Sequence, residues 1–230
     1  MCGFESHPFH RNLFRDNMLR FIGKLPRKCI IAFSGGIDSV VVADFLMNSP
    51  REVELAFFHH GTVNSERAES FVREFAEARR VKLHIGRINS EKSKNVSPEE
   101  FWRDQRYSFL CGFDCPVVTG HHLGDAIETW IFTSLHGESK LIPYARQNVI
   151  RPFLTTPKSE ITARALRNNL SWVDDESNFD LKYMRNLIRA KIVPEALKVN
   201  PGLGKVLRKK YESTFILQEN VIPGNSHDSL

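Results

Sequence analysis

The stretch from Cys29 to Met47, which reads CIIAFSGGIDSVVVADFLM, constrains the fold more than any other part of the chain. Ile30–Phe33 is a short run of apolar and β-branched residues, which predicts a buried strand, and Val40–Met47 has the apolar spacing of a helix. The residues between them, SGGIDS, must turn the chain from the strand directly into the helix. This arrangement predicts an α/β protein with a ligand site at the turn.

The residue types of the SGGIDS turn indicate that it binds phosphate together with a metal ion. Gly35 and Gly36 allow a sharp turn and a close backbone approach, and the helix that follows presents unpaired N–H groups and the positive end of its dipole. The carboxylate of Asp38 would repel a phosphate unless a hard cation such as Mg²⁺ lay between them. Neither GxxxxGK(S/T) nor GxGxxG occurs in the chain. The predicted nucleotide site comprises Ser34, Gly35, Gly36, Ile37, Asp38 and Ser39.

Strand and helix patterns alternate along the following residues. Strands are predicted at Val53–Phe58, Val81–Ile88, Pro116–Thr119 and around Val149 and Ile150, and helices at Ser65–Arg80, from Ser97, from His122 or Leu123, and at Lys158–Asn169. The alternation predicts a doubly wound, mainly parallel, five-stranded sheet of Rossmann-like type. We expect a nucleotide-binding domain over residues 1–175, which begins with an N-terminal helix, and a helical segment over 176–230 that packs on it.

Length, cysteine content and hydropathy narrow the class of protein. The 230 residues suffice for one α/β domain. The four cysteines are too few and too irregularly spaced for a disulfide framework, so a reducing cytoplasm fits better. No apolar stretch approaches the roughly 20 residues of a membrane span. We therefore expect a soluble cytoplasmic protein without a membrane partner.

The positive charge is concentrated near the C-terminus. The chain has a net charge of +5, but residues 182–212 hold nine basic and two acidic residues, a local charge of +7. Such a segment predicts a polyanionic partner. Four of its basic residues are predicted to contact such a partner, with a solvated helix face as the alternative: Lys205, Arg208, Lys209 and Lys210.

A second group of polar residues follows the strand at Pro116–Thr119. If a helix begins near His122, Asp125 and Glu128 share one face of it, with His121 at its mouth. A histidine and two carboxylates at a strand end are typical of metal binding or proton transfer, although an acidic first turn suited to the helix dipole is the alternative for Asp125. His59 and His60 also end a strand, and a role without metal is favoured for them.

Several motifs together resemble the tRNA(Ile)-lysidine synthetases, which belong to the PP-loop ATP pyrophosphatase superfamily. SGGIDS alone is typical of the superfamily. More specific matches are HHG at 59–61, RDQRY at 103–107, GHHLGDAIET at 120–129, RPFL at 151–154 and WVDDESNFDLKYMRNLIRAKIVP at 172–194. The resemblance covers residues 27–202 and implies a short form with the catalytic domain only. His59, Gly124 and His136 depart from the family pattern of Asp, Asp and Arg at these places.

The resemblance implies that ATP and Mg²⁺ are used to join free L-lysine to C2 of the wobble cytidine in the anticodon arm of a tRNA(Ile) with a CAU anticodon. ATP would adenylate the cytidine oxygen, and the lysine amine would then displace AMP to give lysidine. Either Asp125 or Glu128 could accept the amine proton. The implied catalytic residues are Asp38, Arg106, His121, Asp125, Glu128 and Arg185, with Asp38 and Asp125 as metal ligands. The implied substrate contacts, besides the four basic residues named above, are Arg103, Glu128, Arg185, Asn186 and Arg189.

Three other functions compete with this one. A tRNA 2-thiocytidine enzyme shares the loop but needs cysteines for sulfur transfer, and Cys111 and Cys115 form CxxxC, not CxxC. A PP-loop amidotransferase or ligase for a small metabolite would not need the basic segment. An RNA-binding protein with a relic ATP site is the third. The sequence leaves the oligomeric state open, with a homodimer among the options.

Overall fold

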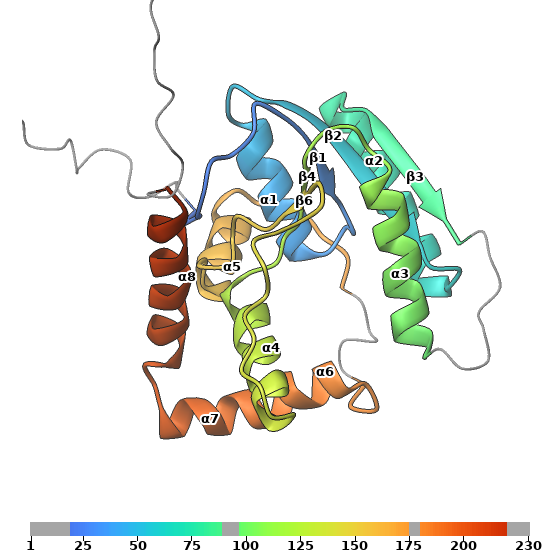
Figure 1. The fold of residues 1–230 in the computed structure, drawn as a ribbon. Helices are drawn as coiled ribbons and strands as arrows, with labels where there is room; N and C mark the ends of the chain where they lie inside the picture. Colours follow the sequence, from blue (N-terminus) through green and yellow to red (C-terminus); the bar gives the residue numbers. More distant parts are fainter. Residues whose placement is uncertain (1–18, 89–96, 175–179, 220–230) are drawn as a thin grey trace, which may run out of the picture.

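A computed structural model describes residues 19–88, 97–174 and 180–219 and shows an α/β protein built on a six-stranded sheet (Figure 1). The strands are β1 (Lys28–Ala32), β2 (Glu52–His59), β3 (Leu83–Arg87), β4 (Val117–Val118), β5 (Ala145–Arg146) and β6 (Val149–Ile150). They lie in the order β3-β2-β1-β4-β6-β5, and every neighbouring pair is parallel except β5 and β6.

Helices follow the parallel strands, as the alternating pattern predicts. They are α1 (Ile37–Met47), α2 (Val63–Arg79), α3 (Pro98–Cys111), α4 (Leu123–Leu135), α5 (Lys158–Arg167), α6 (Met184–Leu187), α7 (Val193–Val199) and α8 (Leu203–Glu219), with a π-helical turn, η2 (Ile188–Ile192), between α6 and α7. Within the described ranges, every helix is too short or too polar to cross a bilayer.

The residues of β1 alternate between the two faces of the sheet. Cys29 and Ile31 belong to the large core that α1, α2 and α5 complete, whereas Ile30 belongs to a smaller core with Tyr107 and Leu110 of α3. Since successive side chains of a strand point to opposite faces, the strand is buried on both sides and reads as a continuous apolar run. The predicted doubly wound sheet is confirmed.

A buried ion pair joins α1 to α5 within the larger core. Asp44 is 4% exposed, and its Oδ2 accepts hydrogen bonds from Arg164 Nε at 3.1 Å, Arg164 Nη2 at 2.8 Å and Asn168 Nδ2 at 2.9 Å. Asn48 Nδ2 donates to Asp44 Oδ1 at 2.9 Å. The carboxylate is thus fully hydrogen-bonded where it is shielded from water, which a buried charge requires.

The helices after α5 build outward from α4. Leu203 and Leu207 of α8 pack against Leu123 and Ile127 of α4, and Tyr211 continues the same stripe of α8. Figure 1 shows α4 reaching from the sheet toward α6 and α7, while α8 stands beside it. Because the stripe recurs every four residues, one face of α8 is buried and its other face is left to polar residues.

Two details of the predicted fold need correction. Most of the predicted N-terminal helix lies outside the described residues, and residues 19–27 are not helical: Ile22 N donates to Pro152 O at 2.9 Å, and Arg20 O accepts a hydrogen bond from Thr156 Oγ1. The sheet also has a sixth strand, because residues 145–146 fold back on β6 through a turn in which Gln147 has a φ of +54°. That strand is too short to give a periodic signal.

Candidate active site

The SGGIDS turn lies at the carboxyl end of β1, and hydrogen bonds from its serines hold its shape. Ser39 Oγ donates to Gly36 O at 2.9 Å and accepts from Ser34 N at 3.2 Å. Gly35 has a φ of +81°, which favours glycine. Gly36 directly precedes the first turn of α1, so the unpaired N–H groups of that turn lie next to the loop. This geometry is suited to an anion.

Two distant segments close around the turn. Val173 N donates to Gly35 O at 2.9 Å, which attaches the segment after Trp172 to the loop. Gly120, directly after β4, lies against Asp38, since a Cβ on this glycine would be 3.1 Å from the carbonyl carbon of Asp38. The ends of β1 and β4 therefore meet, as the sequence predicts for adjacent strand ends.

The carboxylate of Asp38 stands at the mouth of the loop with a lysine beside it. Lys158 Nζ, at the start of α5, is 2.5 Å from Asp38 Oδ1, and His122 Nε2 is 3.6 Å from the same oxygen. Lys158 is a residue that sequence reasoning missed. It is 120 positions from Asp38, and the only signal was its place at a predicted helix start.

His122 and Asp125 form a capping box at the start of α4. His122 Nδ1 accepts from Gly124 N at 2.9 Å, and Asp125 Oδ2 accepts from His122 N at 2.8 Å. Because Nδ1 is an acceptor, the neutral His122 ring carries its proton on Nε2, the atom that faces Asp38. The helix-start explanation of Asp125 is thus confirmed by its geometry. His122, which was not singled out from the sequence, lies between the carboxylates of Asp38 and Asp125.

Asp125 and Glu128 are paired with two arginines that lie about 60 positions later in the sequence. Glu128 Oε2 accepts from Arg185 Nε at 2.9 Å, and Glu128 Oε1 accepts from Arg189 Nε at 2.6 Å. Arg185 Nη2 also donates to Asp125 Oδ1 at 2.5 Å. Both carboxylates are buried, at 7% and 5% exposure, whereas the arginine side chains are about half exposed. The two carboxylates and the two arginines thus form one ion cluster, which joins α4 to α6 and η2.

These pairings shift the ionisation of the site. Burial favours the neutral form of Asp125, but the neighbouring histidines, Arg185 and the N–H of His122 outweigh it, so the pKa of the Asp125 carboxyl lies well below its usual range. Burial likewise lowers the pKa of Arg185, and the two carboxylates reverse this and raise it. Asp125 and Arg185 are therefore both charged at neutral pH.

His121 is the uncharged member of the site. Its Nδ1 is 2.7 Å from Thr119 Oγ1. Burial, together with the guanidinium groups of Arg185, Arg151 and Arg106, lowers the pKa of His121 to about 3, although Asp125 opposes this. The ring is thus neutral at physiological pH.

The remaining predicted substrate residues fall in different places. Arg103 and Arg106 flank Tyr107 on α3. Asn186 does not share the ion cluster of Arg185 and Arg189: it is buried, and its Nδ2 donates to Asp180 O at 3.0 Å. Lys205, Lys209 and Lys210 are exposed on α8, and Arg208 is half-buried.

Comparison with known proteins identifies the fold family. A family model described as the PP-loop domain matches residues 9–196. The chain belongs to the PP-loop family. It is 30% identical over 212 residues to a tRNA(Ile)-lysidine synthase of Pseudothermotoga lettingae, which covers 84% of this chain and 47% of the relative. With a tRNA(Ile)-lysidine synthase of Legionella pneumophila it shares 32% identity over 193 residues, 77% of this chain and 44% of the relative. The chain spans less than half the length of both relatives.

A solved structure agrees with the family assignment at the level of the fold. The U34-tRNA thiolase NcsA from Methanococcus maripaludis, determined with its 4Fe-4S cluster, matches this PP-loop protein with a TM-score of 0.62 and 16% sequence identity, over 90% of this chain and 77% of that one. At this level of identity the likeness concerns the architecture alone.

The donor atoms at the PP-loop suit a magnesium ion that arrives with phosphate. The carboxylate of Asp38 is a hard oxygen donor, one-third exposed, next to the free N–H groups of α1. Both oxygens of Asp125, in contrast, already have partners within the protein. Among the described residues, no group of three or more His, Cys, Asp or Glu is arranged to hold a metal ion. Mg²⁺ is commonly bound by one or two carboxylates plus substrate phosphates, and Asp38 fits that mode.

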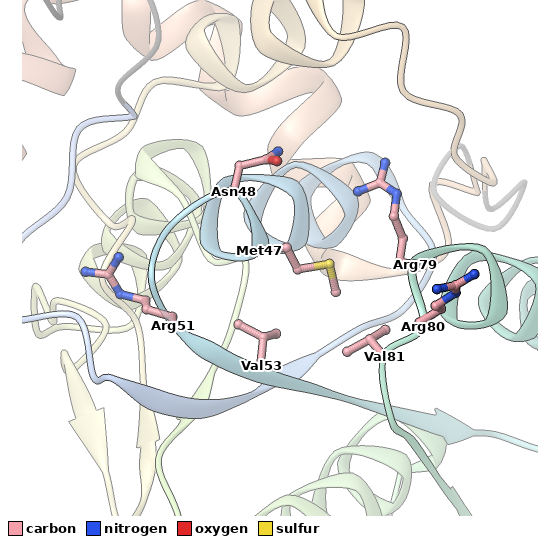
Figure 2. Close-up of a pocket in the computed structure, with 7 residues that line it drawn as sticks. All are labelled: Met47, Asn48, Arg51, Val53, Arg79, Arg80 and Val81. Atoms are coloured by element: carbon pink, nitrogen blue, oxygen red, sulfur yellow. The ribbon is translucent and has the colours of Figure 1, made fainter.

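Described cysteines and a pocket lie at the amino ends of the parallel strands, the opposite end from the PP-loop. Cys29 begins β1 and Cys115 precedes β4, and burial, followed by the proximity of Cys115, raises the pKa of the Cys29 thiol to about 11. A pocket of about 350 Å³ lies between the end of α1, the start of β2 and the end of α2. In Figure 2, Arg51 points away from Arg79 and Arg80 there, so the three guanidinium groups do not converge on one ligand.

Proposed function

We propose that this PP-loop protein is an ATP-dependent tRNA-modifying enzyme that joins free L-lysine to C2 of the wobble cytidine of a tRNA(Ile). Two observations support the proposal: the similarity to tRNA(Ile)-lysidine synthases, and the buried pair Asp125 and Glu128 that faces the PP-loop across His122. The pair carries the argument, because a reaction with an amine needs carboxylates beside the site of activation. We expect the reaction to occur in the cytoplasm.

The first step activates the base. The cytidine O2 attacks the α-phosphorus of ATP, the bond from that phosphorus to the bridging oxygen breaks, and pyrophosphate leaves. The N–H groups of the PP-loop and of the first turn of α1 bind the phosphates, and Lys158 can exchange Asp38 for the departing pyrophosphate. Mg²⁺, when bound with ATP, neutralises phosphate charge, and Asp38 would hold it.

The second step needs a neutral amine. The lysine Nε attacks C2, the C2–O bond breaks, and AMP leaves with the oxygen. With a pKa near 10.4, the amine is neutral in about 4 of 10⁴ molecules at pH 7, a handicap of about 4.6 kcal/mol. One oxygen of Asp125 is held by the N–H of His122 at the start of α4, whereas both oxygens of Glu128 contact only arginines, which an incoming amine can displace. We therefore assign proton acceptance to Glu128 and orientation of the amine to Asp125.

Arg185 and Arg189 determine how lysine reaches these carboxylates. In the protein alone the two arginines take both oxygens of Glu128. An incoming ammonium group must share or displace one of them, and the half-exposed arginine side chains can turn toward an RNA phosphate when they are released. The basic face of α8, with Lys205, Lys209 and Lys210, would add contacts to the anticodon arm.

Two alternatives are less well supported. A thiolation chemistry would need cysteines at the PP-loop, but Cys29 and Cys115 lie at the amino ends of β1 and β4, the opposite end of these strands from the loop. An RNA-binding protein with a relic ATP site would not need a buried carboxylate pair whose charge is compensated by four hydrogen bonds from arginines.

Two substitutions test the proposal through separate half-reactions. Asp38→Ala should abolish tRNA-dependent AMP formation, because the variant lacks the carboxylate for the metal ion. Glu128→Gln should raise the lysine concentration needed for half-maximal rate more than the ATP concentration. AMP formation is measured with tRNA, with and without lysine. Equal changes in both requirements, or AMP release unchanged in the Asp38 variant, would overturn the assignment of these residues.

A further inference from the structure

Four arginines surround the ring of Tyr107 on α3. Their guanidinium carbons lie 5.9, 5.7, 5.0 and 5.9 Å from the ring centroid, in the order Arg103, Arg106, Arg146 and Arg151. Arg103 and Arg106 belong to α3, Arg146 to β5, and Arg151 follows β6. We refer to these four residues as the Tyr107 arginine cluster. Arginines that gather around one aromatic face gain cation–π attraction but repel one another.

No carboxylate within the described residues compensates this charge. Each of the other strong cation groups of the crevice, Lys158, Arg185 and Arg189, has a carboxylate partner, but none of the four cluster arginines forms an ion pair with a described Asp or Glu. Mutual repulsion affects Arg106. Burial and the neighbouring arginines, Arg185 among them, lower the pKa of Arg106, and Tyr107 only partly reverses this. A cluster of like charges without a counterion is suited to an anionic ligand.

The cluster is held in place by buried contacts. Arg151 is 3% exposed, and it donates from Nη2 to the Tyr107 hydroxyl at 2.7 Å and from Nη1 to Pro143 O at 2.8 Å, while its Nε has no partner in the described part of the chain. Asn148 Nδ2 donates to Leu110 O at 3.1 Å and Phe113 O at 2.8 Å, which attaches the turn after Arg146 to the end of α3. The guanidinium of Arg151 is thus fixed by the fold, and the turn that follows Arg146 is anchored to α3.

The cluster adjoins the proposed active site from the other face of the sheet. Arg151 directly follows Ile150, whose carbonyl oxygen accepts a hydrogen bond from Thr119 N at 3.1 Å, and Thr119 Oγ1 is 2.7 Å from His121 Nδ1. The PP-loop leads into α1, which packs on the first face, while α3 covers the second. In the proposed function, the N–H groups of α1 and Lys158 already bind the phosphates of a nucleotide on the PP-loop. The cluster is therefore positioned for a second anion beside the reacting groups.

We propose that the Tyr107 arginine cluster binds the phosphodiester groups of the RNA strand next to the reacting base. The inference rests on the proposed function, because it takes an RNA strand as the substrate. A phosphodiester carries one negative charge, and the planar guanidinium fork matches its two free oxygens. Four cations spread over two segments of the chain suit successive phosphates of a strand better than one isolated anion. Arg146 is thereby added to the residues that contact the substrate, while the buried Arg151 adds positive charge and holds the Tyr107 hydroxyl.

Exposed members of the cluster allow a test that leaves the buried contacts intact. Arg103 and Arg146 are exposed, so Arg103→Gln and Arg146→Gln should fold normally. Arg80→Gln is the matched control, because Arg80 lines the pocket at the start of β2, away from the PP-loop. Binding of a fluorescently labelled anticodon stem-loop RNA is measured over a range of salt concentrations, and ATP binding is measured on the same proteins.

Each cluster variant should bind the RNA about tenfold more weakly at low salt, and the slope of log affinity against log salt should fall by about 0.7 for each phosphate that is no longer neutralised. The Arg80 variant and all ATP affinities should not change. Unchanged RNA affinity and slope in both cluster variants would overturn this inference alone. Weakened ATP binding in those variants would also overturn it and would assign the cluster to nucleotide phosphates. Absence of RNA binding by the unsubstituted protein would overturn the proposed function itself, and this inference with it.

Discussion

Replacing Gly35 by alanine tests the backbone geometry on which the PP-loop depends. Gly35 has a φ of +81°, and an L-residue in the left-handed region costs about 1–2 kcal/mol. A Cβ at this position would lie 3.2 Å from Phe71 Cδ1 and 3.4 Å from Val72 Cγ2, so the Phe71 ring would have to move by a few tenths of an ångström. We expect Gly35→Ala to lower the free energy of unfolding by about 1–2 kcal/mol, a factor of about 5–30 in the ratio of folded to unfolded protein.

Gly36 provides the matched control for the Gly35 substitution. Its φ is −73°, and the nearest atoms to an added Cβ are Ser34 Oγ at 3.5 Å and Val173 O at 4.0 Å. Gly36→Ala should therefore change stability by less than about 0.5 kcal/mol. It should still weaken ATP binding, because the methyl group would obstruct the approach of phosphate to the N–H groups of the loop.

Urea unfolding followed by circular dichroism measures the stability of both variants, and calorimetric titration measures their ATP affinity. The prediction requires a clear difference in unfolding free energy between Gly35→Ala and Gly36→Ala. Equal stabilities would refute the conformational argument. Unaltered ATP affinity in both variants would refute the assignment of the loop to phosphate.

Three further predictions concern stability, pH and RNA binding. Asp44→Ala should lower the free energy of unfolding by about 3–5 kcal/mol, because Arg164 loses its buried carboxylate partner. Arg79→Ala removes a half-exposed cation 3.9 Å from the same carboxylate and should lower it by less than about 1 kcal/mol. Urea unfolding measures both. His121 has a pKa of about 3 in the folded protein and about 6.5 in the unfolded chain, so the unfolded chain binds more protons between these pH values. The free energy of unfolding should therefore fall as the pH drops through this window, by up to about 1.4 kcal/mol per pH unit. His121→Gln should flatten this dependence, and an unchanged slope would contradict the assignment. Replacing residues 208–210 together by alanine should reduce the slope of log RNA affinity against log salt concentration by about 0.7–0.9 for each phosphate that these residues neutralise. ATP binding should not change. An unchanged slope would identify this segment as a solvated surface.

The sequence predicts the larger part of the fold because its signals are local. The apolar run of β1, the glycines of the SGGIDS turn and Ser97 before Pro98 each determine the structure of a few consecutive residues. Ser97 Oγ accepts from Glu100 N at 3.2 Å, as its place before a helix predicts. β5 was missed because two residues carry no periodicity, and its pairing depends on a turn at Gln147.

The candidate site is less predictable because its pairings join distant residues. Asp38 and Lys158 are 120 positions apart, and Tyr107 and Arg151 are 44 apart. No local pattern distinguishes Lys158 from an ordinary first-turn residue of α5. Arg185 and Glu128, in contrast, could be grouped because the resemblance to a known family places both near one reaction. The sequence could not show that the arginines are already paired with the carboxylates.

Asp125 illustrates why one residue can satisfy two explanations at once. Its Oδ2 caps α4 through His122 N, and its Oδ1 receives Arg185. Asp125→Asn should therefore weaken both the helix start and the ion cluster, whereas Glu128 is placed to affect only the cluster. For this reason Glu128 is the better residue for assigning chemistry.

Mass analysis of nucleosides is the most direct test of the central claim, that this PP-loop protein attaches lysine to a cytidine of tRNA. Unmodified tRNA(Ile) with a CAU anticodon is incubated with the protein, ATP and lysine, digested, and compared with tRNA incubated with the Glu128→Gln variant. We expect one cytidine to be heavier by one lysine minus one water. This product should depend on both ATP and lysine, and it should be greatly reduced with the variant at low lysine. An unmodified cytidine, or one in which sulfur replaces oxygen, would contradict the claim.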